Sequence, residues 1–175
     1  MTPEFSRPVR IDVIGDAKSV SVEASQAERE ALARRFGLLA LNKLEADASL
    51  LRKGDEVIAS GKLVANVVQS CVATDVPLAE EVSEEFTIIF RPQPARASEE
   101  DEIELSESEM DVVFYDGSAI DVGEADAETL SLSLEPFPRA PDADDVLRLA
   151  GVKTEEEAGP FGALAGLREK LSGKE

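Results

Sequence analysis

The chain has 175 residues, of which 37 are acidic and 18 are basic, so its net charge is -19. This length fits one domain, and a hydrophobic fraction of 43% is enough to build a buried core. The negative charge disfavours a protein that binds nucleic acid by neutralising phosphates over its whole surface. The lack of histidine excludes Ser-His and Cys-His nucleophiles and histidine-bound metals, and the lone cysteine excludes an internal disulfide.

No part of the sequence predicts a membrane segment or a secretion signal. The unbroken apolar runs are only a few residues long, whereas roughly 20 residues are needed to cross a bilayer. The first ten residues carry charges and no apolar core of a signal peptide. We therefore expect a soluble, cytoplasmic protein that makes no membrane contact and keeps Cys71 reduced.

The negative charge is concentrated in the middle of the chain. Residues 1–74 hold ten acids and ten bases, whereas residues 75–135 hold 19 acids and two bases, a net charge of -17. A charge run of this kind is commonly a solvated, solubilising segment. The alternative is a docking surface for a basic partner.

The first third of the chain predicts two strands and a helix. Val9, Ile11 and Val13 alternate with polar residues and predict a strand over Val9–Val13. Val20 and Val22 suggest a short second strand. Ser25 and Glu28 have the spacing of a capping box, which predicts a helix over Gln26–Phe36. The apolar stripe of that helix is expected to comprise Ala27, Ala31, Leu32 and Phe36.

Strand patterns dominate the next part. Leu39–Leu51, Val57–Val72 and Val82–Phe90 are rich in aliphatic or aromatic residues, with a kink expected at Gly61 and a further strand at Met110–Tyr115. Short turns between such strands predict an antiparallel meander. Residues 91–109 predict a mobile acidic loop because they combine prolines with a run of acids.

Helices are predicted for the last third. Asp121 and Glu124 predict an N-cap for a helix that runs to Leu134 and is ended by Pro136 and Pro138. A helical C-terminal segment is expected over residues 142–171. The predicted fold class is therefore α+β, an antiparallel sheet meander with packed helices and a mobile acidic loop, in a single domain over residues 1–175.

The sequence gives only weak support for a catalytic cysteine, a carboxylate-based calcium or hydrolase site, and a nucleotide-binding loop. A catalytic Cys71 thiolate would need a nearby cation or imidazole, and the acidic segment that follows is expected to raise its pKa, so we interpret Cys71 as a buried structural residue. The acidic stretch Glu99–Asp111 lacks the glycine of a calcium loop, and the absence of tryptophan disfavours a sugar-stacking hydrolase cleft. Gly117–Gly123 matches no nucleotide-binding loop. No cofactor, metal or small-molecule substrate is predicted.

Several short motifs occur in a characteristic order along the chain. They are Gly61-Lys-Leu-Val, Cys71-Val-Ala-Thr-Asp-Val-Pro-Leu, Ile120-Asp-Val-Gly-Glu leading into a helix, Pro136-Phe-Pro-Arg and Pro160-Phe-Gly-Ala-Leu. In this order, from about Phe5 to Leu171, the sequence resembles the YceD family, the large ribosomal RNA subunit accumulation proteins. Many members carry Cys-x-x-Cys where this chain has Cys71 and Thr74, so no metal or redox role is carried over.

The resemblance implies a bacterial, non-enzymatic ribosome-biogenesis factor that supports accumulation or processing of large-subunit (23S) rRNA. The alternatives are an acidic adaptor or chaperone for a basic ribosomal protein and, less favoured, a carboxylate-dependent hydrolase. Partners are then a basic ribosomal protein or assembly factor, with large-subunit rRNA as a further candidate. Family-motif and interaction candidates are Cys71, Asp121, Gly123, Glu124, Pro136, Pro138, Pro160, Phe161 and Leu164.

Two further sets of residues are candidates for contact with a partner. The cations of the near-neutral half are Arg29, Arg34, Arg35, Lys43, Arg52, Lys53 and Lys62, of which the first four are the candidate RNA face. Phe137, Phe161 and Leu164 are candidate apolar anchors beside the acidic segment, and core packing is the alternative for each.

Overall fold

The structure is a computed structural model that describes residues 3–93 and 111–153. Its contacts divide the chain into two compact units. The large unit comprises Met1–Gln69 and Ala79–Pro136, and the small unit comprises Ser70–Leu78 and the chain from Phe137 onward. The prediction of a single domain over residues 1–175 stays a prediction.

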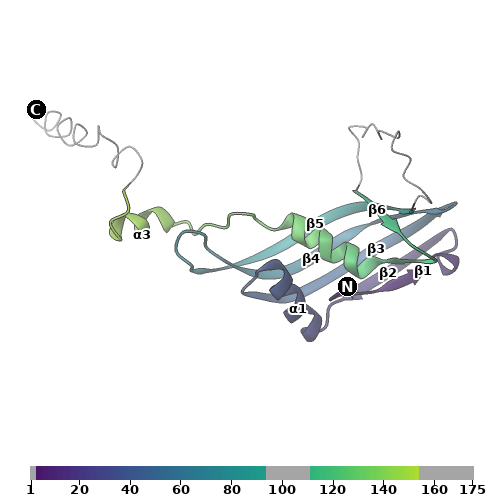
Figure 1. Ribbon diagram of the computed structural model, residues 1–175, viewed down its shortest axis with the longest axis horizontal. Helices are drawn as coiled ribbons and strands as arrows, with labels where there is room; N and C mark the ends of the chain where they lie inside the picture. The colour runs from purple at the N-terminus through teal and green to yellow at the C-terminus, as the bar shows by residue number, and fades with distance from the viewer. Residues whose placement is uncertain (1–2, 94–110, 154–175) are drawn as a thin grey trace, which may run out of the picture. The chain divides into compact units, whose positions relative to one another are not determined.

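A five-stranded sheet is the main element of the fold (Figure 1). In spatial order its strands are β2 (Ala17–Glu23), β3 (Ala40–Lys53), β4 (Glu56–Ser70), β5 (Pro77–Pro92) and β6 (Asp111–Tyr115). The pairs β2–β3 and β3–β4 are antiparallel. Together with the helices, this mostly antiparallel sheet confirms the α+β class.

The sheet differs from a purely antiparallel meander at β6. This strand pairs in parallel with β5, with Ile88 opposite Asp111 and Pro92 opposite Tyr115. Two parallel strands need a connection of about a dozen residues or more, and the chain between β5 and β6 has that length. The predicted loop also begins later than expected, because Arg91 and Pro92 belong to β5. The remainder of that loop, residues 94–109, lies outside the described residues.

The prediction of a strand over Val9–Val13 is only partly correct. Strand β1 is limited to Pro8–Arg10 and pairs with β7 (Ala119–Asp121) in a separate two-stranded sheet. Ile11–Val13 forms a 3₁₀ turn in which the Ile14 amide donates to the Ile11 carbonyl over 3.2 Å. The turn places Ile11 and Ile14 in the core and leaves Val13 exposed, because residues three apart share a face in this helix type.

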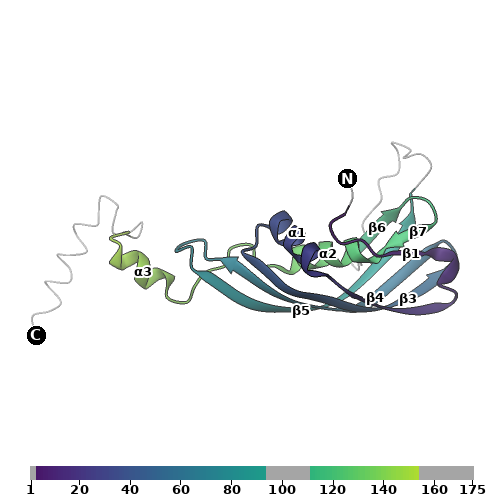
Figure 2. The same ribbon diagram turned by 90° about the horizontal axis from the view of Figure 1, so that it is seen from below.

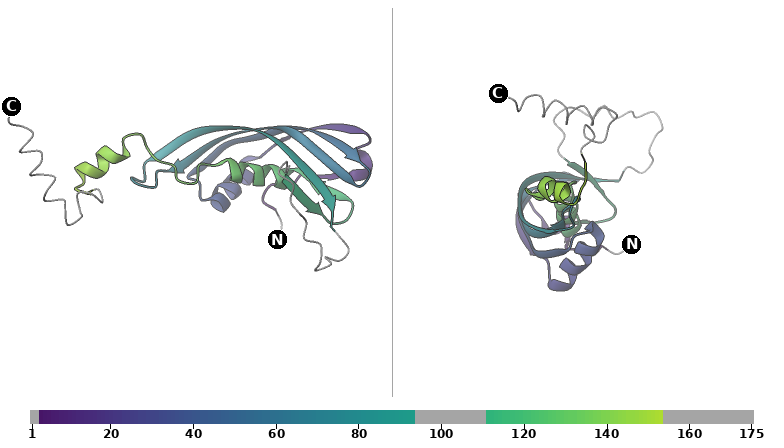
Figure 3. Two further views of the ribbon diagram at one scale, coloured as in Figure 1. Left: turned by 90° about the horizontal axis from the view of Figure 1, so that it is seen from above. Right: turned by 90° about the vertical axis from the view of Figure 1, so that its left-hand side faces the viewer.

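The helices of the large unit lie on one face of the curved sheet, as Figures 2 and 3 show. Helix α1 spans Gln26–Phe36, as predicted, with the capping box of Ser25 and Glu28 at its start. Its most buried residues are Leu32 and Ala33. Ala27 is exposed, so its predicted place in the apolar stripe is wrong. Helix α2 spans Val122–Ser133, capped by Asp121 as predicted.

The small unit contains α3 (Ala143–Leu149), which confirms a helix at the start of the predicted C-terminal segment. The rest of that segment, from residue 154 to 171, lies outside the described residues, as do Pro160, Phe161 and Leu164.

Gly61 lies in the middle of β4, and the pairing of β4 with β3 continues through it. A β-carbon at this position would lie 2.2 Å from the Asp47 carbonyl oxygen and 2.8 Å from the Ala48 α-carbon. The constraint on Gly61 is therefore the close approach of β3, since both neighbouring atoms belong to the backbone and neither can rotate away.

Replacing Gly61 with alanine is expected to destabilise the protein by about 1–3 kcal/mol or more, the usual cost of overpacking a well-packed site. Urea unfolding followed by circular dichroism measures the change. Ser60→Ala is the matched control, because Ser60 is the exposed neighbour on the same strand. Equal stability of Gly61→Ala and Ser60→Ala would contradict the close packing of β3 on Gly61.

Candidate interaction surfaces

The family-motif residue Asp121 joins the N-terminal segment to the start of α2. Its carboxylate accepts hydrogen bonds from the Ser6 hydroxyl (2.5 Å), the Arg7 amide (2.7 Å) and the Glu124 amide (3.2 Å). A capping carboxylate is stabilised by the free amides and the positive end of the helix dipole. All three donors point to its oxygens, so Asp121 is a structural cap in this arrangement.

Gly123 allows the N-terminal segment to approach α2 closely. A β-carbon on Gly123 would lie 2.7 Å from the Phe5 carbonyl oxygen and 3.0 Å from the Arg7 nitrogen. Phe5 itself is completely buried. The glycine of the family motif is thus required by backbone packing.

Two arginines complete this junction, which we call the N-terminal clamp (Phe5–Arg7, Glu28, Arg35, Asp121, Gly123 and Glu124). Arg7 binds both carboxylate oxygens of Glu28 at 2.7 and 2.9 Å, and this pairing lowers the pKa of Glu28 to about 2. Arg35 binds both carboxylate oxygens of Glu124 at 3.1 and 2.8 Å and also contacts Glu4. The clamp therefore holds α1, α2 and the N-terminal segment together.

The small unit brings together two other motif residues. The Val72 amide donates to the Pro138 carbonyl over 2.9 Å. The Cys71 sulfur accepts from the Ala140 amide over 3.3 Å and is completely buried. The expected burial of Cys71 is therefore observed, and its structural role stays an interpretation. The expectation of a raised pKa is wrong, because the neighbouring Thr74 side chain, followed by the Ala140 amide, lowers the pKa of Cys71 to about 7.

The two remaining motif and anchor positions that the structure describes are Pro136 and Phe137. Pro136 follows the C-terminal end of α2 in the large unit. Phe137 begins the second segment of the small unit, and its side chain is 74% exposed. That exposure is compatible with the anchor role expected from the sequence.

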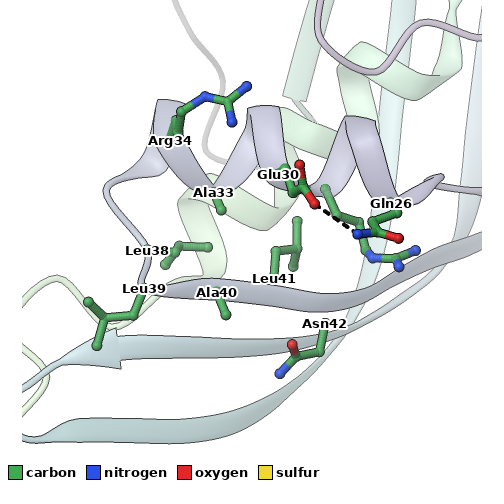
Figure 4. Close-up of a pocket in the computed structure, with 10 residues that line it drawn as sticks. Gln26, Glu30, Ala33, Arg34, Leu38, Leu39, Ala40, Leu41 and Asn42 are labelled. Atoms are coloured by element: carbon green, nitrogen blue, oxygen red, sulfur yellow. Dashed lines mark hydrogen bonds between the residues drawn. The ribbon is translucent and has the colours of Figure 1, made fainter.

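The candidate RNA face is brought together only in part. Arg29 and Arg34 line a hollow between α1 and the start of β3, together with Gln26 and Asn42 (Figure 4). Arg35 lies in the N-terminal clamp. Lys43 forms an ion pair with Glu45 at 2.6 Å.

The floor of this hollow is apolar. Ala33, Leu38 and Leu41 lie between the helix and the strand, whereas Arg34 reaches away from the strand (Figure 4). The side chain of Arg34 makes no hydrogen bond or ion pair with any residue in the described ranges. Arg29 donates to the Ala24 carbonyl over 2.5 Å. The hollow therefore offers a weakly basic site with one unpaired guanidinium.

The other cations of the near-neutral half do not extend this hollow into a basic face. Arg52 donates to the carbonyls of Gly54 and Ile11 at 2.8 and 3.2 Å, which ties the β3–β4 turn to the 3₁₀ turn. Lys53 and Lys62 are exposed on β3 and β4. The described cations are thus spread over several elements.

The exposed acids of β5 form a surface that sequence reasoning did not single out. Glu80, Glu81, Glu84 and Glu85, the β5 glutamates, are exposed. Within the described ranges their side chains make no hydrogen bond and no ion pair, although the pKa of Lys43, raised mainly by its hydrogen bond to Glu45, is raised further by the charge of Glu81. Their position in the acidic middle of the chain was visible, but their placement along one strand edge required the strand order. Glu99–Glu109, the other part of that acidic stretch, lies outside the described residues.

One buried carboxyl group stands apart from both surfaces. Asp126 on α2 is completely buried, and neither of its oxygens has a hydrogen-bond partner in the described part of the chain. Loss of water around the carboxylate, and secondarily the charge of Asp121, raise the pKa of Asp126 to about 7. A carboxyl group without access to solvent cannot contact a substrate in this conformation.

Residues 3–93 and 111–153 contain no group of three histidine, cysteine or acidic side chains placed to hold a metal ion. Among the helices of these ranges, none is long and apolar enough to cross a membrane.

The clamp, the acidic strand and the mostly antiparallel sheet define an acidic α+β protein whose motif residues hold the fold together. The family model of the large ribosomal RNA subunit accumulation protein YceD matches residues 59–168, more than half of the chain. The chain therefore belongs to the YceD family, and the family's name indicates a role in ribosome biogenesis through large-subunit rRNA. No curated protein and no solved structure matches the chain.

Replacing Asp121 with asparagine is expected to destabilise the protein by about 1–3 kcal/mol, because charged groups form stronger hydrogen bonds and three donors lose a carboxylate acceptor. Thermal unfolding measures the loss. Glu128→Gln is the control, since Glu128 is an exposed acid on the same helix. If Asp121→Asn keeps full stability, the clamp does not depend on this carboxylate.

Asp126 predicts a pH dependence of stability. Its pKa is raised from 3.8 to about 7 in the folded protein, so between these values the folded state binds more protons than the unfolded state. Stability is then lost as the pH rises through this window, and the upper bound of the loss is on the order of 4 kcal/mol.

The Asp126→Asn variant tests this dependence. Its free energy of unfolding should exceed that of the wild type at about pH 8 by more than it does at about pH 5, because only the wild type must ionise a buried group. Urea titrations at both pH values give the two differences. A difference that is independent of pH would show that Asp126 titrates normally.

Proposed function

We propose that this protein is a non-enzymatic, cytoplasmic ribosome-biogenesis factor that supports the accumulation or processing of 23S rRNA by binding a basic ribosomal protein or assembly factor. Membership of the YceD family supports the ribosomal part of the proposal. The observation that carries the binding part is the distribution of charge. Arg7, Arg35 and Lys43 are paired with carboxylates, whereas the β5 glutamates are exposed and unpaired within the described ranges.

An acidic surface can promote RNA assembly indirectly. A basic ribosomal protein binds RNA non-specifically through phosphate contacts. An acidic partner competes for the same lysines and arginines and holds the protein until the correct RNA site is available. Each exposed ion pair contributes only about 0–1 kcal/mol, so several contacts must act together, and apolar anchors such as Phe137 would add to them.

Direct contact with rRNA is the second candidate, and the hollow beside α1 favours it. Arg29 and Arg34 lie there together, and a flat guanidinium such as that of the unpaired Arg34 suits a phosphate or a base. This site is small and holds few cations, which supports a local contact on a larger assembly more than independent RNA binding.

A carboxylate-dependent hydrolase is less well supported. The family-motif carboxylate Asp121 already accepts hydrogen bonds from two backbone amides and a hydroxyl. Asp126 has a raised pKa but lies in the core. A stable Asp121→Asn protein that loses activity in cells would nevertheless favour the enzyme class.

Cells that lack the gene test the function. We expect a lower ratio of 23S to 16S rRNA and fewer complete large subunits in sucrose gradients, both restored by the wild-type gene. Normal rRNA and normal subunit profiles without the gene would contradict the proposal.

Charge reversal separates a protein partner from RNA. Replacing several of Glu99, Glu100, Asp101, Glu102 and Glu104 with lysine is expected to abolish binding of a basic protein partner and to leave or improve RNA affinity, because the new charges attract phosphates. If RNA is the direct ligand, Arg29→Glu with Arg34→Glu should weaken RNA binding and leave binding of the protein partner unchanged. Filter binding with rRNA and pull-down of the protein partner give the two readouts.

If the lysine variant binds its protein partner as well as the wild type does, the acidic stretch is a solubilising segment and takes no part in binding.

A further inference from the structure

Strand β5 has an open edge over half of its length. It runs over Pro77–Pro92, but β6 pairs only with Ile88–Pro92. In the described chain nothing pairs with the segment before Ile88 on that side of the sheet, and Figure 1 shows β6 beside one end of β5 only. We propose that the β5 edge over residues 79–87 binds an extended, lysine- or arginine-rich segment of a partner protein as an added strand. This inference rests on the proposed binding of a basic partner.

The backbone of β5 presents its hydrogen-bonding groups at this edge. The Gln93 amide donates to the Tyr115 carbonyl over 3.0 Å, so it points toward β6. Along a strand the backbone amide and carbonyl groups of successive residues point alternately to the two edges. The backbone groups of Glu81, Ser83 and Glu85 are therefore expected to point to the same edge as the Gln93 amide. The two-residue repeat of β5 continues over this segment, because the even-numbered residues Val82, Phe86 and Phe90 are all buried.

The negative charge of this edge favours a basic strand over a second copy of this chain. The four β5 glutamates would lie beside an added strand, where opposite charges stabilise and like charges destabilise the pair. A second copy of this chain would oppose glutamate with glutamate, so these residues disfavour pairing of two copies. The other outer strand, β2, carries only Lys18 and Glu23 as charged residues and lacks this preference.

A hollow beside the edge can receive side chains of the added strand. It is lined by residues 84–87 of β5, by Asp111 at the start of β6, and by Thr129, Leu132 and Ser133 of α2. Leu132 is 78% exposed. A lysine or arginine packs its aliphatic stem on an apolar residue while its charge contacts carboxylates, and the hollow offers Leu132 together with Glu84 and Asp111 for this purpose.

Two synthetic peptides of about nine residues, a usual strand length, test the proposal on the full-length protein. Both alternate lysine with valine. In the second peptide every backbone nitrogen is methylated, which removes the donors of both edges and keeps all charges. Strand addition predicts that the methylated peptide binds at least about tenfold more weakly, because several backbone hydrogen bonds are lost. Calorimetry gives both affinities.

Protein variants locate the site. Glu81→Lys with Glu85→Lys should weaken binding of the unmethylated peptide by about tenfold or more, given the cost of like charges across a strand pair. Asp47→Lys with Asp16→Lys is the control with the same change of net charge, since both acids are exposed and lie away from β5; Asp47 is on β3, which has neighbours on both sides. Hydrogen exchange should show new protection of the Glu81, Ser83 and Glu85 amides when the peptide is bound.

The outcomes separate this inference from the proposed function. Equal binding of both peptides, or equal loss in the β5 and control variants, means attraction by charge alone and overturns strand addition while leaving the proposed function intact. Failure of both peptides to bind also overturns it. The proposed function is tested independently by the rRNA ratio in cells without the gene.

Discussion

The carboxylate of Asp121 is the contact on which the arrangement of the large unit depends most. It begins α2 and at the same time fixes the N-terminal segment through the Ser6 hydroxyl and the Arg7 amide. Once Arg7 is placed, its guanidinium reaches Glu28, and Glu28 in turn belongs to the capping box of α1. A single carboxylate thereby links the N-terminal end of α2 to that of α1. The pairing of β1 with β7 begins at the same residue.

The absence of a side chain on Gly123 makes this junction possible. The N-terminal segment passes so close to α2 that even a methyl group would meet its backbone. Adjacent motif residues thus supply complementary parts of one junction, namely the acceptor at Asp121, the close approach at Gly123 and the ion pair of Glu124 with Arg35. The motif by which the chain resembles its family is therefore explained largely by the fold, and the surfaces available for a partner lie elsewhere.

Local signals in the sequence predicted the parts of the fold that depend on neighbours along the chain. The capping box predicted α1 at its observed bounds, and alternation of apolar residues predicted β3 and β4. The pairing of β1 with β7 and the parallel docking of β6 depend on contacts between distant residues, which no local pattern contains. The same reason explains why Arg35 was expected on an RNA face, since its partner Glu124 is far away in the sequence. Lys43, in contrast, pairs with Glu45 on the same strand, a contact that the two-residue spacing already allowed.

The charge of the protein has a different consequence in each half of the sequence. Cations of the near-neutral half are largely used in internal contacts, such as those of Arg7 and Arg35. In the acidic middle part Asp121, Glu124 and Asp126 lie in the clamp or the core, whereas the β5 glutamates remain on the surface. The protein therefore presents to its surroundings mainly the charge that attracts basic partners, which accords with a supporting role in the assembly of ribonucleoprotein.

The central claim is that the direct partner is a basic protein. Purification of the tagged protein from cells, with and without ribonuclease treatment, tests this claim most directly, with mass spectrometry and RNA analysis of what is retained. Our account predicts that a basic large-subunit ribosomal protein or assembly factor is retained after ribonuclease treatment and is released by high salt, because screening weakens exposed ion pairs. Loss of every ribosomal component on ribonuclease treatment would contradict it and would identify RNA as the direct ligand.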